Sequence, residues 1–279
     1  MRTLGRHPKV LVGRLVVVGA LVLAAACGGG GGDDEDAGSD TAASESTTAT
    51  TEATTATTAA AETAGEDPAP AAPTGTDISL VAQAQVPEVH VYAEPDTASE
   101  NTHTLANPNE NGAPLVFLVQ GGQQPTGEWL EVQLPVRPNG TTGWVQAAEV
   151  RLAQHDYRIR VEPGAHRLVL TEGGEVMLEA PIGVGTQDTP TPGGTYYVKE
   201  LLQPPDPEGA YGPYAYGLSG FSNAVTSFAG GDGVIGIHGT KEPETVGTDV
   251  SQGCIRLTND VVTQLAEVVP LGTPVEIVA

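Results

Sequence analysis

From residue 77 onward, the chain consists of short apolar runs whose spacing is typical of β-strands. In the segment 129–134, the apolar residues Leu130, Val132 and Leu134 alternate with polar ones, which is the period of a half-buried strand. Alternation or a short apolar run predicts further strands near residues 89–92, 115–119, 143–145, 157–161, 167–170, 176–180, 195–198, 233–237 and 274–278. The pattern therefore predicts a mainly β fold.

Glycine and proline mark the connections between these strands. Pro138-Asn139-Gly140 and Gly173-Gly174 are turn signals, and the Gly/Thr/Pro-rich segment 183–194 is predicted to be a loop. The pattern assigns no element to the glycine-rich and aromatic segment 204–233. One helix is expected near the end of the chain, where Asn259 can cap it. Its apolar face would carry Val261, Val262, Leu265, Val268 and Val269.

The start of the chain has the pattern of an export signal. Four basic residues precede the apolar run 15–26, which is too short for a comfortable membrane span and ends in three alanines. Cys27 follows at the position where bacterial lipoprotein signals place the lipidated cysteine. We therefore expect a lipid anchor on Cys27, at the outer face of the cell membrane and within the cell wall. Ordinary secretion, with cleavage among the same alanines, is the alternative.

The acidic, Thr/Ala-rich segment 28–76 contains no aromatic residue and almost no large aliphatic one. Such a composition does not bury enough apolar surface to offset the entropy of ordering, so we expect a disordered tether with a reach of about 40 Å. The predicted organisation is a signal peptide with its lipidation cysteine (1–27), the tether (28–76), a first folded domain (77–153) and a second (154–279).

Charge and cysteine content narrow the function. The chain has 12 Lys and Arg residues against 35 Asp and Glu residues, and this negative balance argues against nucleic-acid binding. Of the two cysteines, Cys254 has no disulfide partner once Cys27 is lipidated or removed. An unpaired thiol outside the cytoplasm indicates a reactive nucleophile or an intermolecular bridge, whereas a buried structural cysteine is the alternative. No four-ligand set supports a zinc site.

The first folded domain resembles the bacterial SH3-like domain over about 65 residues. The resemblance is carried by an early strand that ends in Tyr92-Ala93-Glu94-Pro95 and by a late strand that begins with Gly143-Trp144-Val145. It implies a small barrel that binds wall peptides or spaces a neighbouring catalytic domain. Trp129 and Trp144 are candidates either for the core or for a ligand platform.

The second folded domain carries His238-Gly239-Thr240 and, further on, Ser251-Gln252-Gly253-Cys254-Ile255-Arg256-Leu257. Together with the segments 191–194 and 211–220, these motifs resemble the L,D-transpeptidase (YkuD-type) catalytic domain from Asp156 to the end of the chain. The resemblance implies a β-sandwich-like domain and a cysteine acyltransferase. Its cysteine attacks the peptide stem of peptidoglycan, D-alanine leaves, and an amine of a second stem accepts the acyl group.

The resemblance also implies roles for the matched residues. Cys254 would be the nucleophile and His238 the base, with the carbonyl of Gly239 orienting the imidazole. Gly253 would allow close approach of the backbone, and amides around Gly253 and Cys254 would stabilise the oxyanion. The candidates for substrate binding are Ser251, Arg256, Thr240 and Tyr214. A local hydrogen bond for Ser251, a structural network for Arg256 and core packing for one of the nearby tyrosines are the alternatives.

The resemblance further implies that carbapenem-type β-lactams acylate Cys254, and that no cofactor or metal is needed because the thioester conserves the energy of the broken bond. Two alternatives stay open from the sequence. The same acyl-enzyme would give an L,D-carboxypeptidase if water replaced the amine, and a chain without catalysis would be a wall-binding lipoprotein.

Overall fold

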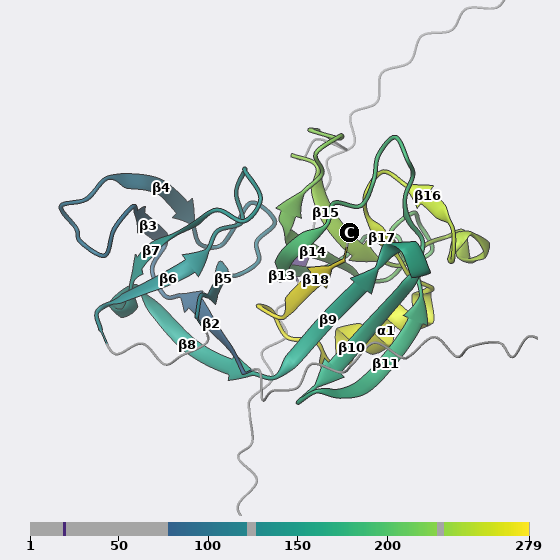
Figure 1. The fold of residues 1–279 in the computed structure, drawn as a ribbon, viewed down its shortest axis with the longest axis horizontal. Helices are drawn as coiled ribbons and strands as arrows, with labels where there is room; N and C mark the ends of the chain where they lie inside the picture. Colours follow the sequence, from purple (N-terminus) through teal and green to yellow (C-terminus); the bar gives the residue numbers. More distant parts are fainter. Residues whose placement is uncertain (1–18, 21–77, 122–126, 228–231, 279) are drawn as a thin grey trace, which may run out of the picture. The chain divides into compact units, whose positions relative to one another are not determined.

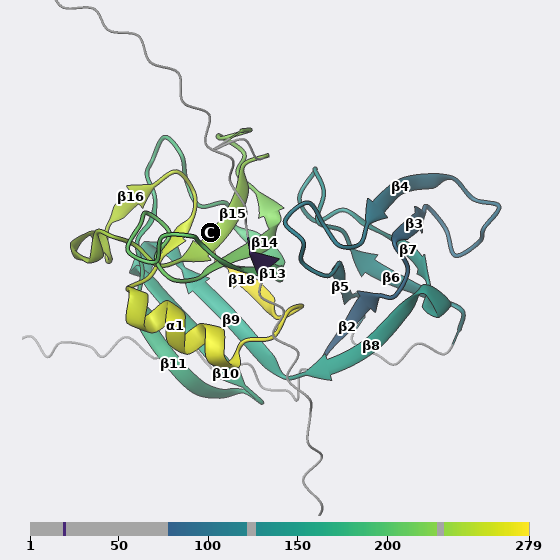
Figure 2. The same ribbon diagram turned by 180° about the vertical axis from the view of Figure 1, so that it is seen from behind.

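The computed structural model describes residues 19–20, 78–121, 127–227 and 232–278 (Figures 1 and 2). Cys27, the predicted tether and, apart from Gly19 and Ala20, the predicted signal peptide lie outside these residues. Within the described part of the chain, no helix has both the length and the apolar character needed to cross a membrane.

The first folded region is a seven-stranded antiparallel sheet with the strand order β4-β3-β7-β6-β5-β2-β8. Its elements are β2 (Ser79–Ala84), β3 (Glu88–Tyr92), β4 (Asn101–Ala106), β5 (Val116–Val119), β6 (Trp129–Gln133), β7 (Thr142–Gln146), η1 (Ala147–Glu149) and β8 (Val150–His155). Leu130 and Val132 on β6 are buried, as their alternation predicts, and they pack with Phe117 in one apolar cluster. The SH3-like character of this region stays a prediction.

The second region is a nine-stranded sheet with the order β11-β10-β9-β18-β13-β14-β15-β17, and β1 (Gly19–Ala20) pairs in parallel with β13. Its other strands are β9 (Tyr157–Glu162), β10 (Arg167–Glu172), β11 (Glu175–Pro181), β13 (Gly194–Gln203), β14 (Ala215–Phe221), β15 (Val234–His238), β17 (Ile255–Arg256) and β18 (Pro274–Ile277). A separate two-stranded sheet pairs β12 (Val184–Gly185) with β16 (Asp249–Ser251), and two short 3₁₀ turns are η2 (Pro163–Ala165) and η3 (Pro243–Thr245). The prediction of a mainly β fold is confirmed.

The helix α1 (Asn259–Val268) is the one α-helix among the described residues. Figure 2 shows it over the part of the sheet that holds β9 and β10, and Val262 and Leu265 belong to the same core cluster as the side chains of those strands. The predicted cap was wrong. Thr258 occupies the cap position without a capping bond from its side chain, whereas Asn259 is the first helical residue and its Oδ1 accepts a hydrogen bond from Thr240 N (2.9 Å).

Strand β14 lies in the segment to which the sequence pattern assigned no element. It is a central strand between β13 and β15 and is buried on both faces, so its residues do not alternate. A side chain at Gly217 would collide with Glu200, and one at Gly220 would collide with Tyr196. These two glycines are therefore set by the neighbouring strand rather than by a turn. The segment 183–194, predicted to be a loop, contributes the short strand β12.

The two sheets are joined by direct contacts and belong to one compact unit. Tyr197 on β13 is fully buried in a cluster with Val81, Val116 and Leu118 of the first sheet. Its hydroxyl donates to the carbonyl of Val116 at 3.1 Å. The chain passes from β8 to β9 at Asp156, so the predicted division between residues 153 and 154 falls inside β8.

Candidate active site

The pairing of β15 with β17 brings the predicted histidine and cysteine together. The two strands are parallel, with Ile237 opposite Ile255, so His238 ends β15 while Cys254 immediately precedes β17. Gly236 lies between them, because a Cβ placed on it would be 3.7 Å from His238 Cδ2 and 3.9 Å from Cys254 Sγ. Ile235 and Ile237 of β15 enter the core, and the alternation of the strand places Gly236 and His238 on its other face.

The imidazole of His238 is held in one orientation. Its Nδ1 lies 2.6 Å from the carbonyl oxygen of Gly239, which only accepts, so Nδ1 carries the proton and Nε2 is left as the basic nitrogen. Burial lowers the pKa of His238 to about 4, against the opposing effect of the Gly239 carbonyl. The side chain is therefore a neutral imidazole at neutral pH, in the orientation that the resemblance implies.

The thiol of Cys254 is also neutral in the free protein. Burial raises its pKa, while the backbone of Gly236 and the positive charge of Arg256 favour the thiolate and limit the rise. A neutral thiol beside a neutral imidazole can transfer its proton to Nε2 as the sulfur attacks. The pair is suited to general-base activation rather than to a standing thiolate–imidazolium ion pair.

The loop before Cys254 is fixed by its own hydrogen bonds. Gly253 has a φ of +114°, which strongly favours glycine, and its N–H donates to Ser251 Oγ at 3.1 Å. The same hydroxyl donates to the carbonyl of Cys254 at 2.6 Å. Ser251 thus holds the turn, and it engages one of the two amides that the sequence assigned to the oxyanion.

Thr240 also has local partners at both its polar groups. Its N–H donates to Asn259, and its hydroxyl accepts a hydrogen bond from Glu242 N at 3.1 Å. Arg256 donates to Glu242 Oε2 at 3.3 Å while its charge also lowers the pKa of His238. The substrate contacts predicted for Thr240, Ser251 and Arg256 stay predictions.

Tyr211, which the sequence offered with Tyr214 and Tyr216 as part of a lid over the acceptor side, lies beside the pair. Its ring meets that of His238 edge-on, with 4.9 Å between the centroids, and it is 37% exposed. Burial raises the pKa of Tyr211, and a thiolate on Cys254 would raise it further. Tyr214, the predicted substrate residue, is half-buried against the core, and its carbonyl accepts from Gly239 N at 3.3 Å. Gly212, which follows Tyr211, has a φ of +65° and packs closely against Gly239.

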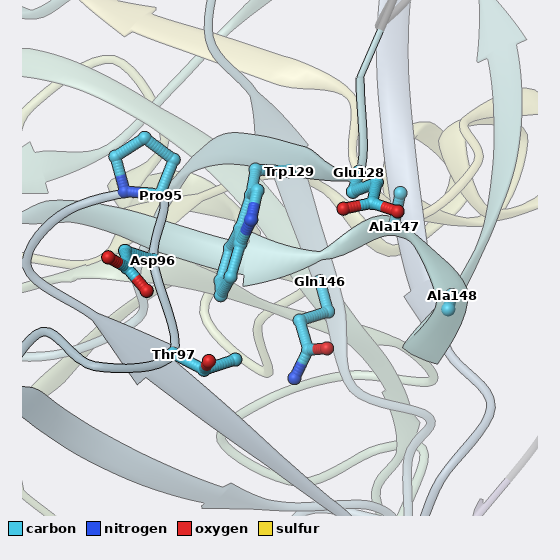
Figure 3. A pocket seen from close by; sticks show the side chains of 8 residues that line it. All are labelled: Pro95, Asp96, Thr97, Glu128, Trp129, Gln146, Ala147 and Ala148. Carbon is cyan, nitrogen blue, oxygen red and sulfur yellow. The ribbon is translucent and has the colours of Figure 1, made fainter.

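Two surface pockets lie outside the cysteine–histidine pair. A pocket of about 430 Å³ borders Thr240 and Lys241 near the start of α1. Figure 3 shows a second pocket, of about 500 Å³, on the first sheet, where the indole of Trp129 stands between Asp96 and Gln146. Trp129 is partly exposed and packs edge-on against Tyr92, so it contributes both to packing and to this pocket wall. In the described residues, no group of three His, Cys, Asp or Glu side chains is arranged to hold a metal ion.

Comparison with known proteins bears on the second region. Residues 156–277 match the family model of the L,D-transpeptidase catalytic domain, YkuD. The predicted resemblance of this region is thereby confirmed. The chain is similar to the putative L,D-transpeptidase YkuD of Bacillus subtilis (strain 168), with 39% identity over 121 residues, 43% of this chain and 65% of that relative. The chain thus spans somewhat under two thirds of the relative's length.

Solved structures similar to this chain include two further L,D-transpeptidases. One, from Enterococcus faecium, has 24% identity and a TM-score of 0.35 and covers 44% of this chain and 49% of its own. The other, L,D-transpeptidase 3 from Mycobacterium tuberculosis in complex with a faropenem-derived adduct, has 15% identity and a TM-score of 0.38 and covers 52% and 76%. The YkuD-type match does not extend to residues 1–155.

Proposed function

We propose that this protein is a peptidoglycan L,D-transpeptidase that cross-links stem peptides through an acyl-enzyme on Cys254, with release of D-alanine. One observation carries the proposal. A buried histidine, with its Nδ1 proton fixed on the Gly239 carbonyl, shares the space beside Gly236 with a cysteine thiol. This pair lies within the segment that matches the YkuD catalytic domain.

The first half of the reaction forms a thioester. His238 Nε2 takes the thiol proton as the Cys254 sulfur attacks the carbonyl that precedes the terminal D-alanine. We assign the stabilisation of the resulting oxyanion to the N–H of Cys254, because the loop already uses the N–H of Gly253. The imidazolium then gives its proton to the leaving amine, the C–N bond breaks, and D-alanine departs.

The second half transfers the acyl group. An amine from a neighbouring stem attacks the thioester carbonyl, His238 accepts a proton from that amine, and the C–S bond breaks to return the thiol. If water takes the place of the amine, the product is the free tripeptide. Carbapenem-type β-lactams offer the same kind of electrophilic carbonyl to Cys254, and we propose them as inhibitors of the protein.

Intact-protein mass spectrometry tests the proposal. The purified chain is incubated with a carbapenem and, separately, with a disaccharide-tetrapeptide, beside a Cys254→Ala control. The expected result is a carbapenem adduct that the control lacks, together with a cross-linked dimer and free D-alanine from the tetrapeptide. If tripeptide forms without dimer, the protein is an L,D-carboxypeptidase and not a transpeptidase. If the folded wild-type protein gives neither adduct nor product, the result would favour the alternative of a non-catalytic wall-binding protein.

The proposed site of action is outside the membrane, with the chain anchored through a lipid on Cys27. The support is the basic start, the apolar run and the position of Cys27 in the sequence. The test is cell fractionation of the wild type and of Cys27→Ser. The wild type is expected in the membrane fraction and the variant in the soluble fraction. Equal distribution of the two proteins would contradict the anchor.

A further inference from the structure

The turn between β6 and β7 of the first sheet reaches the end of β14 in the second. Asn139 Nδ2 donates to the carbonyl of Phe221 at 2.8 Å, and its Oδ1 accepts from Phe221 N at 2.9 Å. Arg137 donates to the carbonyl of Ser222 at 3.0 Å and to that of Asp232 at 2.9 Å. Its guanidinium carbon lies 4.8 Å from the centroid of the Phe221 ring. We call Arg137 and Asn139 the β6–β7 clamp.

The clamp meets β14 on the side where its ladder with β13 has ended, while on the other side Phe221 still pairs with Val234 of β15. The pairing of β13 with β14 stops at Val198 and Leu218. Beyond that point, the side chain of Asn139 hydrogen-bonds both the N–H and the carbonyl of Phe221. It thereby replaces the backbone partners that β13 would supply. The clamp thus supplies, from another sheet, the backbone partners that hold the end of this strand.

The clamped segment lies directly against the turn that presents the thiol. A Cβ placed on Gly253 would be 3.6 Å from Ser222 Oγ and 3.6 Å from the carbonyl of Pro190. Ser222 itself is 3% exposed, and its N–H is bound to the carbonyl of Gly233 at 2.8 Å. The backbone of Ser222 is therefore fixed at its N–H by Gly233 and at its carbonyl by Arg137. This fixed residue forms one wall beside Gly253.

We propose that Arg137 and Asn139 are positioning residues for acyl transfer: they hold Phe221 and Ser222 against Gly253, so that the strained turn presents Cys254 to the donor carbonyl. The inference rests on the proposed function and deepens it. It assigns to the first sheet a part in the chemistry that no residue of the catalytic motif reveals. Displacements of about 1 Å in such supports lower rates by up to about 100-fold, and we expect a smaller loss, roughly tenfold, when one side of the clamp is removed.

The test compares clamp variants of the full chain with a matched control. The variants are Arg137→Ala, Arg137→Lys, Asn139→Ala and Asn139→Asp, the last of which keeps the acceptor and loses the donor. The control is Arg151→Ala, because Arg151 belongs to the same sheet and its guanidinium binds only the exposed Gln83 side chain among the contacts of the structure (2.9 Å). Three quantities are measured: carbapenem acylation of Cys254 against concentration, alkylation of Cys254 by iodoacetamide, and the thermal midpoint.

The expected result is a roughly tenfold lower limiting rate of acylation in both alanine variants, with the half-saturating concentration unchanged. Arg137→Lys should recover part of the rate, and Arg151→Ala should match the wild type. Alkylation of Cys254 should change in the same variants. Where an alanine variant does not fold, the lysine and aspartate variants decide.

Limiting rates equal to the wild type in the folded clamp variants would overturn the inference, as would a loss that follows only the unfolded fraction. The proposed function fails in a distinguishable way. In that case the wild-type protein itself would not be acylated, and the alkylation rates alone would decide whether the clamp positions the thiol.

Discussion

The imidazole of His238 and the sulfur of Cys254 are both packed next to Gly236, because a Cβ placed on this glycine would be 3.7 Å from His238 Cδ2 and 3.9 Å from Cys254 Sγ. The same compactness removes water from both groups, which lowers the pKa of the imidazole and raises that of the thiol. In the proposed reaction, activation of the thiol therefore depends on a proton that moves during the attack, and not on a thiolate and imidazolium that exist beforehand.

The pH dependence of acylation follows from the imidazole. Because the pKa of His238 lies at about 4, the base is neutral above that pH and becomes protonated only below it. Arg256, close by, disfavours the protonated form further. We expect the rate of Cys254 acylation by a carbapenem to stay level from about pH 8 down to about pH 5 and to fall as the pH passes through about 4. A stopped-flow or mass-spectrometric pH profile measures this, and an acid limb centred on the ordinary histidine pKa, about 6.5, would contradict it.

Gly253→Ala tests the turn before Cys254, where the positive φ favours glycine. The position has room for a methyl group, with its nearest neighbours 3.6 Å away, so the cost comes from the backbone at φ +114°. We expect about 1–3 kcal/mol lower stability in urea unfolding and at least a tenfold slower acylation. Gly247→Ala is the matched control, because Gly247 has a φ of +96° and open space around it. It should lose stability and keep the acylation rate, and equal rate losses in both variants would remove the special role of the turn.

Elements differ in how much of their structure the sequence reveals. Strand β6 was predictable because its apolar residues alternate with polar ones, whereas β14, buried on both faces, has no such alternation. The helix α1 was predictable from its apolar face, but Asn259 was assigned the wrong partner, since its side chain binds a loop 19 positions earlier. The motif identified Cys254 and His238, whereas the ring contact between His238 and Tyr211 depends on the fold, which local spacing does not reveal.

Asn259→Ala tests the link between α1 and the turn after His238. The change removes the acceptor of the Thr240 N–H, and Thr240 is only 3% exposed, so a buried donor is left without this partner. We expect a loss of about 1–3 kcal/mol in the free energy of unfolding, measured with urea, and slower acylation. Thr258→Ala is the comparison, because Thr258 makes no capping bond from its side chain. A loss in Thr258→Ala as large as that in Asn259→Ala would show that any change at the start of α1 has this effect, and would contradict a specific role of the bond to Thr240.

On the scale of the whole molecule, the two sheets share a buried junction. Tyr197 is fully buried there, and Glu200, only 2% exposed, accepts hydrogen bonds from Asn109 (2.8 Å) and Asn111 (3.1 Å) of the first region. Contacts of this kind span about ninety positions in the chain, which is why no local pattern predicts them. They tie the stability of one sheet to that of the other.

Unfolding experiments can measure this coupling. Trp129 and Trp144, the only tryptophans of the chain, report on the first sheet, and alkylation of Cys254 reports on the second. We expect the two probes to give one urea midpoint. Tyr197→Phe should lower the free energy of unfolding by about 1–2 kcal/mol, because the buried carbonyl of Val116 loses its hydroxyl partner. Both urea midpoints should therefore move down together. Separate midpoints, or a shift confined to one probe, would contradict a shared junction.

The junction has a consequence for anyone who would move the chemistry to another protein. A protein made only of the segment after Asp156 would expose the ring of Tyr197. The carboxylate of Glu200 would lose its two amide donors, and the backbone of Phe221 would lose its hydrogen bonds with Asn139. We therefore expect that the segment with Cys254 and His238 does not keep its structure when it is separated from the first sheet. The smallest portable unit includes both sheets.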